Sequence, residues 1–162
     1  MAINPALDQF PTEALAIGKM VASFGEIELL FGLLAGSALR NQNLALRAMY
    51  RIRSTGGRID LADVLMRDVL IREGFQAHYE ETLGVVRHCL KIRNQYAHCH
   101  WSPGTDGLFF TNLEEAANRA DDHKHVDLTI LKEQEAFFDH ANFCIWAKNS
   151  TRKLKRQDSL SF

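Results

Sequence analysis

The feature that most constrains the fold is a long apolar stretch near the start of the chain, in which hydrophobic residues recur with helical spacing. Thr12 can cap a helix whose first turn carries Glu13. Apolar residues then return every three or four positions as far as Leu34, which predicts one helix over Thr12 to Leu39. Because its second half is apolar almost all round, we expect this helix to pack on two sides, and one side can be a partner subunit.

The most apolar part of this helix does not predict a membrane span. The run from Ile27 to Leu39 is interrupted by Glu28, contains Gly32 and Gly36, and follows Glu26. A span needs about 20 predominantly apolar residues. We therefore expect a buried helix and no membrane association.

Breaks in the apolar pattern divide the following sequence into three more helices. The breaks are Asn41-Gln42-Asn43 and Ser54-Thr55-Gly56-Gly57. Helices are predicted over Leu44 to Ile52, from Ile59 to near Gly74, and from Phe75 to His98. The last of these helices is about six turns long.

The segment before the closing helix is rich in turn signals, at Ser102-Pro103-Gly104 and at Asp106-Gly107. Leu108 to Leu113 and His125 to Leu128 have the length of two strands of a small hairpin, or are extended loop, and Thr129 opens the closing helix. The chain is therefore predicted to be all-α, an up-and-down helical bundle with room for a small β-hairpin before the last helix.

Length and composition predict one soluble domain over residues 1–162, frayed at about 1–11 and 157–162. The net charge of -1 gives no global reason to bind a polyanion, so any nucleic-acid contact must come from local patches. Cys89, Cys99 and Cys144 lack metal-type spacing, and the start of the chain has no signal-peptide pattern. We expect reduced thiols and a cytoplasmic protein.

The end of the predicted fourth helix carries an arginine, an amide and an imidazole, namely Arg93, Asn94 and His98. A guanidinium grips a phosphate bidentately and keeps its charge. A histidine titrates near neutral pH and moves a proton without a metal. These side chains suit phosphate chemistry, although a surface arginine beside a helix-terminal histidine gives the same short pattern.

Arg93-Asn94 followed by Ala97-His98 resembles the signature of the HEPN superfamily (higher eukaryotes and prokaryotes nucleotide-binding domains). That signature has an arginine, a polar residue and a histidine after four to six intervening positions, and four residues intervene here. The likeness extends through a turn at Trp101, an extended Leu108-Phe109-Phe110 segment and the long closing helix. One departure is Cys99, where the family commonly has a small residue. The resemblance implies a HEPN-type bundle.

Helical geometry separates the two main groups of this motif. Five residues at 100° each place Arg93 and His98 about 140° apart around a regular helix, whereas Asn94 and His98 share a face. The groups can converge if the helix unwinds near Ala97, or if two copies meet across a two-fold axis. The resemblance implies the second arrangement, a homodimer with a composite site.

The resemblance also implies a metal-independent RNA endonuclease of toxin or defence type, with no cofactor and with an antitoxin or regulatory protein as a further partner. His98 would move a proton at the ribose 2′-hydroxyl or the leaving 5′-oxygen, and Arg93 would stabilise charge on the phosphate. Asn94 would orient His98 or the phosphate. The product would carry a 2′,3′-cyclic phosphate, and DNA would be spared. Glu26 or Glu28 is a candidate partner for Arg93.

Basic residues offer a track for the RNA substrate. The segment from Arg40 to Ile59 holds no acidic residue, and Tyr50 within it can stack on a base. The residues predicted to bind substrate are Arg47, Arg51, Arg53 and Arg58. A solvated helix face with a local charge bias is the alternative.

No metal site is predicted, because the chain has no CxxC pair. His98, His100, His123 and His125 would offer ligands only if the extended segment folded back beside the helix end. Two further functions remain open. One is a non-catalytic HEPN-like nucleotide-binding, RNA-binding or protein-interaction adaptor, and the other is a structural protein whose first helix docks a partner.

Overall fold

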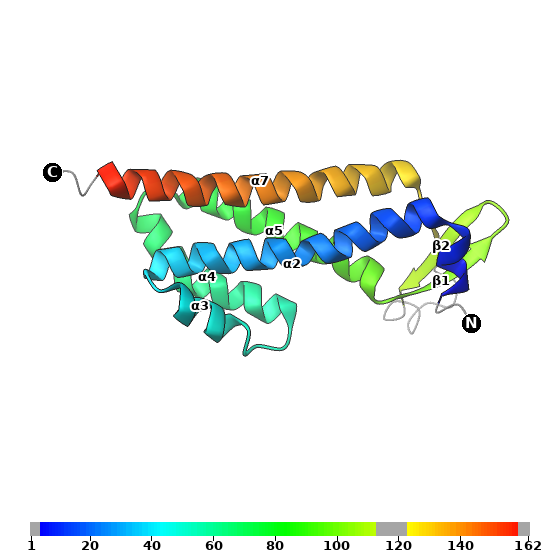
Figure 1. Ribbon diagram of the computed structural model, residues 1–162, viewed down its shortest axis with the longest axis horizontal. Helices are drawn as coiled ribbons and strands as arrows, with labels where there is room; N and C mark the ends of the chain where they lie inside the picture. The colour runs from blue at the N-terminus through cyan, green and yellow to red at the C-terminus, as the bar shows by residue number, and fades with distance from the viewer. Residues whose placement is uncertain (1–3, 113–122, 159–162) are drawn as a thin grey trace. The chain divides into compact units, whose positions relative to one another are not determined.

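Helices account for most of the chain (Figure 1), which confirms the mainly helical class. The computed structural model describes residues 4–112 and 123–158, and the side chains of all of these except 148–158. The helices are α1 (Pro5–Gln9), α2 (Pro11–Leu39), α3 (Gln42–Met49), α4 (Thr55–Arg72), α5 (Gln76–Ala97) and α7 (Leu128–Asp158). The strands are β1 (Cys99–Gly104), β2 (Gly107–Asn112) and β3 (Lys124–His125).

The predicted helices correspond to α2, α3, α4, α5 and α7, with ends shifted by a few residues. Two of the shifts arise because capping residues lie inside the predicted breaks. Asn41 Oδ1 accepts a hydrogen bond from Leu44 N at 3.0 Å, so α3 begins at Gln42. Ser54 Oγ accepts one from Gly57 N at 3.2 Å, so α4 begins at Thr55.

The expectation of a frayed start is wrong for Pro5–Gln9, which forms α1. Asn4 accepts a hydrogen bond from Leu7 N at 3.5 Å, and Pro5 occupies the first turn, where its missing N–H costs nothing. Ala6 is buried, and α1 contacts β1. Tertiary contact therefore orders a segment too short to be stable as an isolated helix. At the other end, α7 extends to Asp158, and 159–162 lie outside the described residues.

The two predicted strands pair with each other as β2 and β3, although β3 ends at His125 and Leu128 begins α7. A third strand, β1, joins them in an antiparallel sheet of order β1-β2-β3. β1 was not predicted because Ser102-Pro103-Gly104 was interpreted as a turn. In the structure this segment is extended, and the chain reverses between Gly104 and Gly107. Pro103 is tolerated because β1 is an edge strand among the described residues. A Cβ at Gly104 would lie 2.4 Å from the Phe109 ring, so glycine is needed there. Leu113, the predicted end of β2, lies outside the described residues.

The described chain groups into two compact units, and α2, α5 and α7 each contribute to both. The first unit comprises Met1–Phe24 and Lys91–Phe138. Here Tyr96, Trp101 and Phe110 pack together, with ring centroids 5.6 to 6.1 Å apart. Tyr96 Oη also donates to Gln134 Oε1 at 2.8 Å. These contacts fix the last turn of α5 against the sheet and the start of α7.

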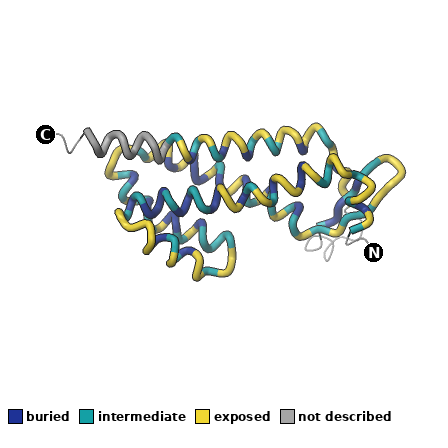
Figure 2. Tube along the Cα trace, in the orientation of Figure 1, coloured by how far each residue is buried: buried dark blue, intermediate teal, exposed yellow. Residues whose placement is uncertain are grey.

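The second unit comprises Gly25–Leu90 and Asp139–Phe162. Its core includes Ile27 and Phe31 of α2, Met49 of α3 and Met66 of α4, all with at most 1% of their surface exposed (Figure 2). A Cβ on Gly32 would lie 2.9 Å from the Leu46 side chain, so this glycine allows α2 and α3 to approach closely. The apolar second half of α2 is thus a core element, as expected.

The end of α2 adopts an unusual conformation for its sequence. Arg40 N donates to Ser37 O at 3.3 Å and Asn41 N to Gly36 O at 2.9 Å, and Arg40 has a φ of 56°. This pattern is a Schellman motif, whose left-handed position is usually glycine. An arginine there is disfavoured by about 1–2 kcal/mol.

By length and composition α2 is able to cross a membrane, with a mean hydropathy of 1.4 over its most apolar window. The sequence argument against a membrane span considered only the run from Ile27 to Leu39, whereas the whole of α2, Pro11–Leu39, is long and apolar enough to pass this test. Half of that window is buried within the fold, as in a core helix of a soluble protein, so hydropathy does not decide where the protein resides.

Candidate functional site

Arg93, Asn94 and His98 meet within one chain at the end of α5. Arg93 Nη1 donates to Asn94 Oδ1 at 3.0 Å and lies 3.4 Å from His98 Nε2. The helix ends at Ala97, and His98 lies in the turn before β1. The angle of about 140° applies only to a regular helix. Of the two ways of convergence that the sequence left open, the structure has the first, because the backbone leaves the helix after Ala97 and before His98. We call these three residues the Arg93 cluster.

The backbone around the Arg93 cluster is held by buried neighbours on the same turn. Ile92 and Tyr96 are buried, which directs the intervening Arg93 and Asn94 away from the core. Cys99 Sγ donates to Tyr96 O at 3.3 Å, which ties the first residue of β1 to the helix end. Burial raises the pKa of the Cys99 thiol to about 11, so it remains a neutral thiol near pH 7. The departure from the family pattern at this position therefore adds a structural contact and no reactive thiolate.

Arg93 has no acidic partner in the part of the chain that the structure describes. Its two contacts are the amide oxygen of Asn94 and the ring nitrogen of His98, and no carboxylate pairs with it among the described residues. Glu28, one candidate partner, instead accepts from Arg58 Nη1 at 2.9 Å. Arg93 is half-buried, whereas Asn94 and His98 are exposed. An unpaired guanidinium at the surface is suited to an anion that arrives from solvent.

The contact between Arg93 and His98 also identifies the tautomer that fits it. A guanidinium has only donors, so a hydrogen bond between the two groups requires Nε2 of His98 to accept and the ring proton to reside on Nδ1. In this state the imidazole is neutral and Nε2 carries a lone pair. That is the form in which a histidine acts as a general base.

His123 and His125, two of the other histidines of the sequence hypothesis, have separate partners. His123 Nδ1 lies 2.7 Å from Thr111 Oγ1, and His125 Nε2 lies 3.3 Å from the backbone oxygen of Asp106. The His125 ring also meets Phe109 edge to face, with centroids 5.2 Å apart. Among the described residues no three His, Cys, Asp or Glu side chains are grouped so that they could hold a metal ion.

The predicted substrate-binding arginines fall into different environments. Arg58 is fully engaged: Nη1 contacts Glu28, Nε donates to Ile52 O at 2.7 Å, and Nη2 to Arg53 O at 3.4 Å. Its guanidinium also lies 5.2 Å from the centre of the Tyr50 ring. Arg47 and Arg51, by contrast, are exposed and line a surface hollow.

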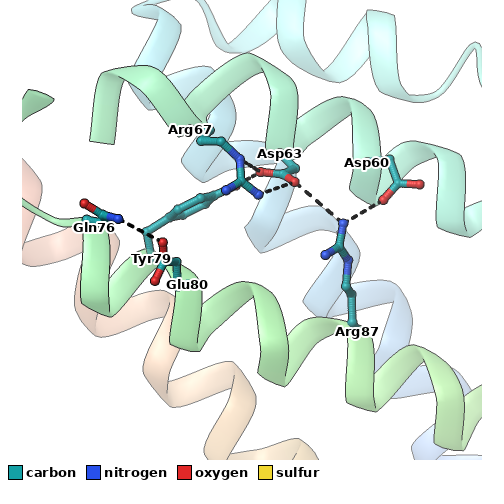
Figure 3. A network of polar contacts seen from close by, with 7 residues as sticks. All are labelled: Asp60, Asp63, Arg67, Gln76, Tyr79, Glu80 and Arg87. Carbon is teal, nitrogen blue, oxygen red and sulfur yellow. Dashed lines mark hydrogen bonds and ion pairs between the residues drawn. The ribbon is translucent and has the colours of Figure 1, made fainter. Parts of the chain in front are cut away.

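A polar network that the sequence reasoning missed joins α4 and α5 in the second unit (Figure 3). Asp63 accepts from Arg67 through both oxygens, at 2.9 and 2.8 Å, and from the hydroxyl of Tyr79. Arg87 Nη2 lies 3.0 Å from Asp60 Oδ1 and 3.6 Å from Asp63 Oδ2. The spacing of Asp63 and Arg67, four positions apart on one helix, was the available signal. Tyr79 was not predictable as their partner from spacing.

Charge balance makes this network structural rather than reactive. Burial opposes ionisation of Asp63, but hydrogen bonds from Arg67 and Tyr79 outweigh it and lower the pKa of Asp63. Burial, together with the neighbouring Asp63, raises the pKa of Tyr79 well above its ordinary value. Tyr79 is 2% exposed and Asp63 8% exposed. Both groups therefore hold fixed protonation states near pH 7.

Comparisons with known protein families, with curated proteins and with solved structures find no match to this chain.

Proposed function

We propose that this chain is a metal-independent RNA endonuclease of HEPN type, acting through the Arg93 cluster. The observation that carries the proposal is that Arg93 contacts both Asn94 and His98 at the surface of one chain, with the guanidinium free of any acidic partner among the described residues. The family and the activity come from the motif, and the proximity of its groups supports them.

In the proposed reaction the phosphate of an RNA linkage binds Arg93. The guanidinium N–H groups turn to the phosphate oxygens, which releases the Nε2 lone pair of His98. His98 accepts the proton of the 2′-hydroxyl as its oxygen attacks phosphorus. The bond from phosphorus to the 5′-oxygen breaks, and the product carries a 2′,3′-cyclic phosphate. Asn94 acts by positioning the guanidinium.

The leaving 5′-oxygen needs a proton as well, and the cluster contains one histidine. A second copy of the chain would supply a second His98 as the acid, so a homodimer remains part of the proposal. Exposure of the apolar helix supports it further, because Leu29, Leu30 and Leu33 of α2 are only half-buried. Sedimentation as a monomer at a concentration at which the protein cleaves RNA would refute the dimer. The cytoplasmic setting, the role in toxicity or defence and an antitoxin partner are proposed from the motif alone.

The experiment is a cleavage assay on labelled RNA in EDTA. We expect His98→Ala and Arg93→Ala each to lose at least the roughly 100-fold that one acid or base group contributes. Two matched controls should keep activity: His100→Ala removes another exposed histidine, and Lys91→Ala removes another exposed cation. Equal loss in the controls, or activity that survives in both cluster variants, would refute the assignment. RNA binding without cleavage by the wild type would support the non-catalytic adaptor instead.

A further inference from the structure

A basic hollow lies along α3 in the second unit. Its volume is about 430 Å³, within the range of roughly 300–1,000 Å³ typical of ligand sites. The residues that line it are Asn41, Asn43, Leu44, Arg47, Ala48 and Arg51. None of them is acidic, and the sequence holds no acidic residue from Arg40 to Ile59. The hollow is thus a local concentration of positive charge in a chain whose net charge is -1.

The two arginines of the hollow are available to a ligand. Arg47 and Arg51 are exposed, and neither forms an ion pair within the part of the chain that the structure describes. Arg58 shows the contrast, since Glu28 and two backbone carbonyls occupy its guanidinium. Within the segment from Arg40 to Ile59, Arg58 therefore stabilises the fold, whereas Arg47 and Arg51 line the hollow.

The remaining lining residues add amide donors and an apolar wall. Asn41 uses its side-chain oxygen to cap α3, which leaves its NH₂ group as the part that can meet an acceptor. Leu44 is 58% exposed although it is apolar. Cations beside an apolar wall match a ligand in which phosphates alternate with flat, weakly polar bases. A single inorganic anion would use only the arginines and would leave most of the volume empty.

We infer that this hollow binds single-stranded RNA, with backbone phosphates on Arg47 and Arg51 and a base against Leu44. The inference deepens the proposed function and rests on it for the RNA substrate, although binding here needs no chemistry at the Arg93 cluster. It also narrows the predicted basic track, since Arg58 serves the fold and Arg53 does not line the hollow.

The test measures affinity for a fluorescent single-stranded RNA whose 2′-hydroxyls are methylated, so that cleavage cannot interfere. The double variant Arg47→Ala/Arg51→Ala should bind at least about tenfold more weakly than wild type. The slope of log affinity against log salt should fall by about 1.4, at roughly 0.7 for each lost phosphate contact. Arg53→Ala is the matched control, because it removes an exposed arginine of the same segment from outside the hollow. It should bind nearly as wild type.

Three results would overturn the inference: no binding by the folded wild type, equal weakening in the control, or a mononucleotide that binds as tightly as the oligomer. Circular dichroism of each variant checks that it is folded. We expect every variant to fold, because the replaced arginines are exposed. The two proposals fail separately. If RNA binding requires Arg47 and Arg51 but natural RNA is not cleaved, only the nuclease proposal is refuted. If natural RNA is cleaved but RNA binding does not require these arginines, only the RNA-binding site is refuted.

Discussion

Two polar clusters in this protein are built from similar side chains and end in opposite electrostatic states. In the Asp63 network, the guanidinium of Arg67 meets a carboxylate through two hydrogen bonds, and the acceptor is buried. In the Arg93 cluster, the guanidinium contacts an amide oxygen and an imidazole nitrogen and no carboxylate among the described residues, next to exposed side chains. The first arrangement is complete without a ligand. The second keeps a full positive charge at the surface.

The difference shows how to separate arginines that hold a fold from those that can act on a ligand. An arginine paired with a carboxylate has already exchanged water for that carboxylate. An incoming phosphate must therefore compete with the carboxylate for the guanidinium. An arginine held by neutral acceptors is positioned without being neutralised. Arg58 and Arg67 belong to the first kind and Arg93 to the second, whereas Arg47 and Arg51 are exposed and form no ion pair within the described part of the chain.

The largest stability effect should come from removing the acid of the structural cluster. Asp63→Ala leaves the buried Tyr79 hydroxyl without its acceptor and breaks both hydrogen bonds to Arg67. We expect a loss of about 2–3 kcal/mol in the free energy of unfolding, measured by urea denaturation. Val64→Ala is a suitable control, because Val64 is 75% exposed on the same helix. A loss no greater than that of the control would remove the distinction between the two clusters.

Removing only the tyrosine hydroxyl should have a smaller effect. Tyr79→Phe keeps the buried ring and deletes one hydrogen bond to a carboxylate that Arg67 still engages. We expect a loss of about 1.5 kcal/mol, the lower end for a hydrogen bond to a charged group. Chemical denaturation at neutral pH checks this value. A variant as stable as wild type would show that Asp63 and Arg67 do not need Tyr79.

The pH dependence of stability tests whether Asp63 is ionised in this network. Because the pKa of Asp63 is lowered in the folded protein, its contribution is fully present above its ordinary value of 3.8. The contribution declines as the pH falls below that value and through the folded pKa. Denaturation curves between neutral and acidic pH should therefore converge for wild type and Asp63→Asn. A difference that stays constant down to the lowest pH would contradict the charged state assigned to Asp63.

The smallest stability effect is expected at the exposed cluster. Arg93→Ala and His98→Ala remove groups with no ionic partner among the described residues, so each should change the free energy of unfolding by no more than about 0.5 kcal/mol. Thermal and urea denaturation would measure it. A loss comparable to that of Asp63→Ala would make the Arg93 cluster a structural element.

The helices were predictable from local sequence patterns, because the spacing of buried apolar residues in a helix is set within one continuous segment. Apolar spacing located α2, α4, α5 and α7 closely, and the capping residues Asn41 and Ser54 explain where the ends differ. β1 was not predictable in the same way, because its extended form depends on pairing with β2. The short helix α1 likewise depends on its contact with β1.

The candidate site was predictable in its residues but not in its geometry. The spacing of Arg93, Asn94 and His98 identified the groups, yet a helical wheel placed two of them on different faces. The chain departs from the helix at His98, where Cys99 begins to pair with Asn112 of β2. That departure depends on the sheet, which no local pattern around the motif contains. The structural role of Arg58, which the sequence assigned to substrate binding, was also not predictable, because its contact with Glu28 spans 30 positions.

The most direct test of the proposed role of the Arg93 cluster is the chemistry of the RNA ends after incubation with the purified protein in EDTA. Attack by the 2′-oxygen predicts a 2′,3′-cyclic phosphate on one product and a free 5′-hydroxyl on the other, identified by mass spectrometry. A strand with one 2′-deoxyribose at the cleaved linkage should remain intact there, and His98→Ala should yield no such ends. Products with a 5′-phosphate, cleavage that requires a divalent metal, or the same cyclic ends from His98→Ala would contradict the assignment of catalysis to Arg93 and His98.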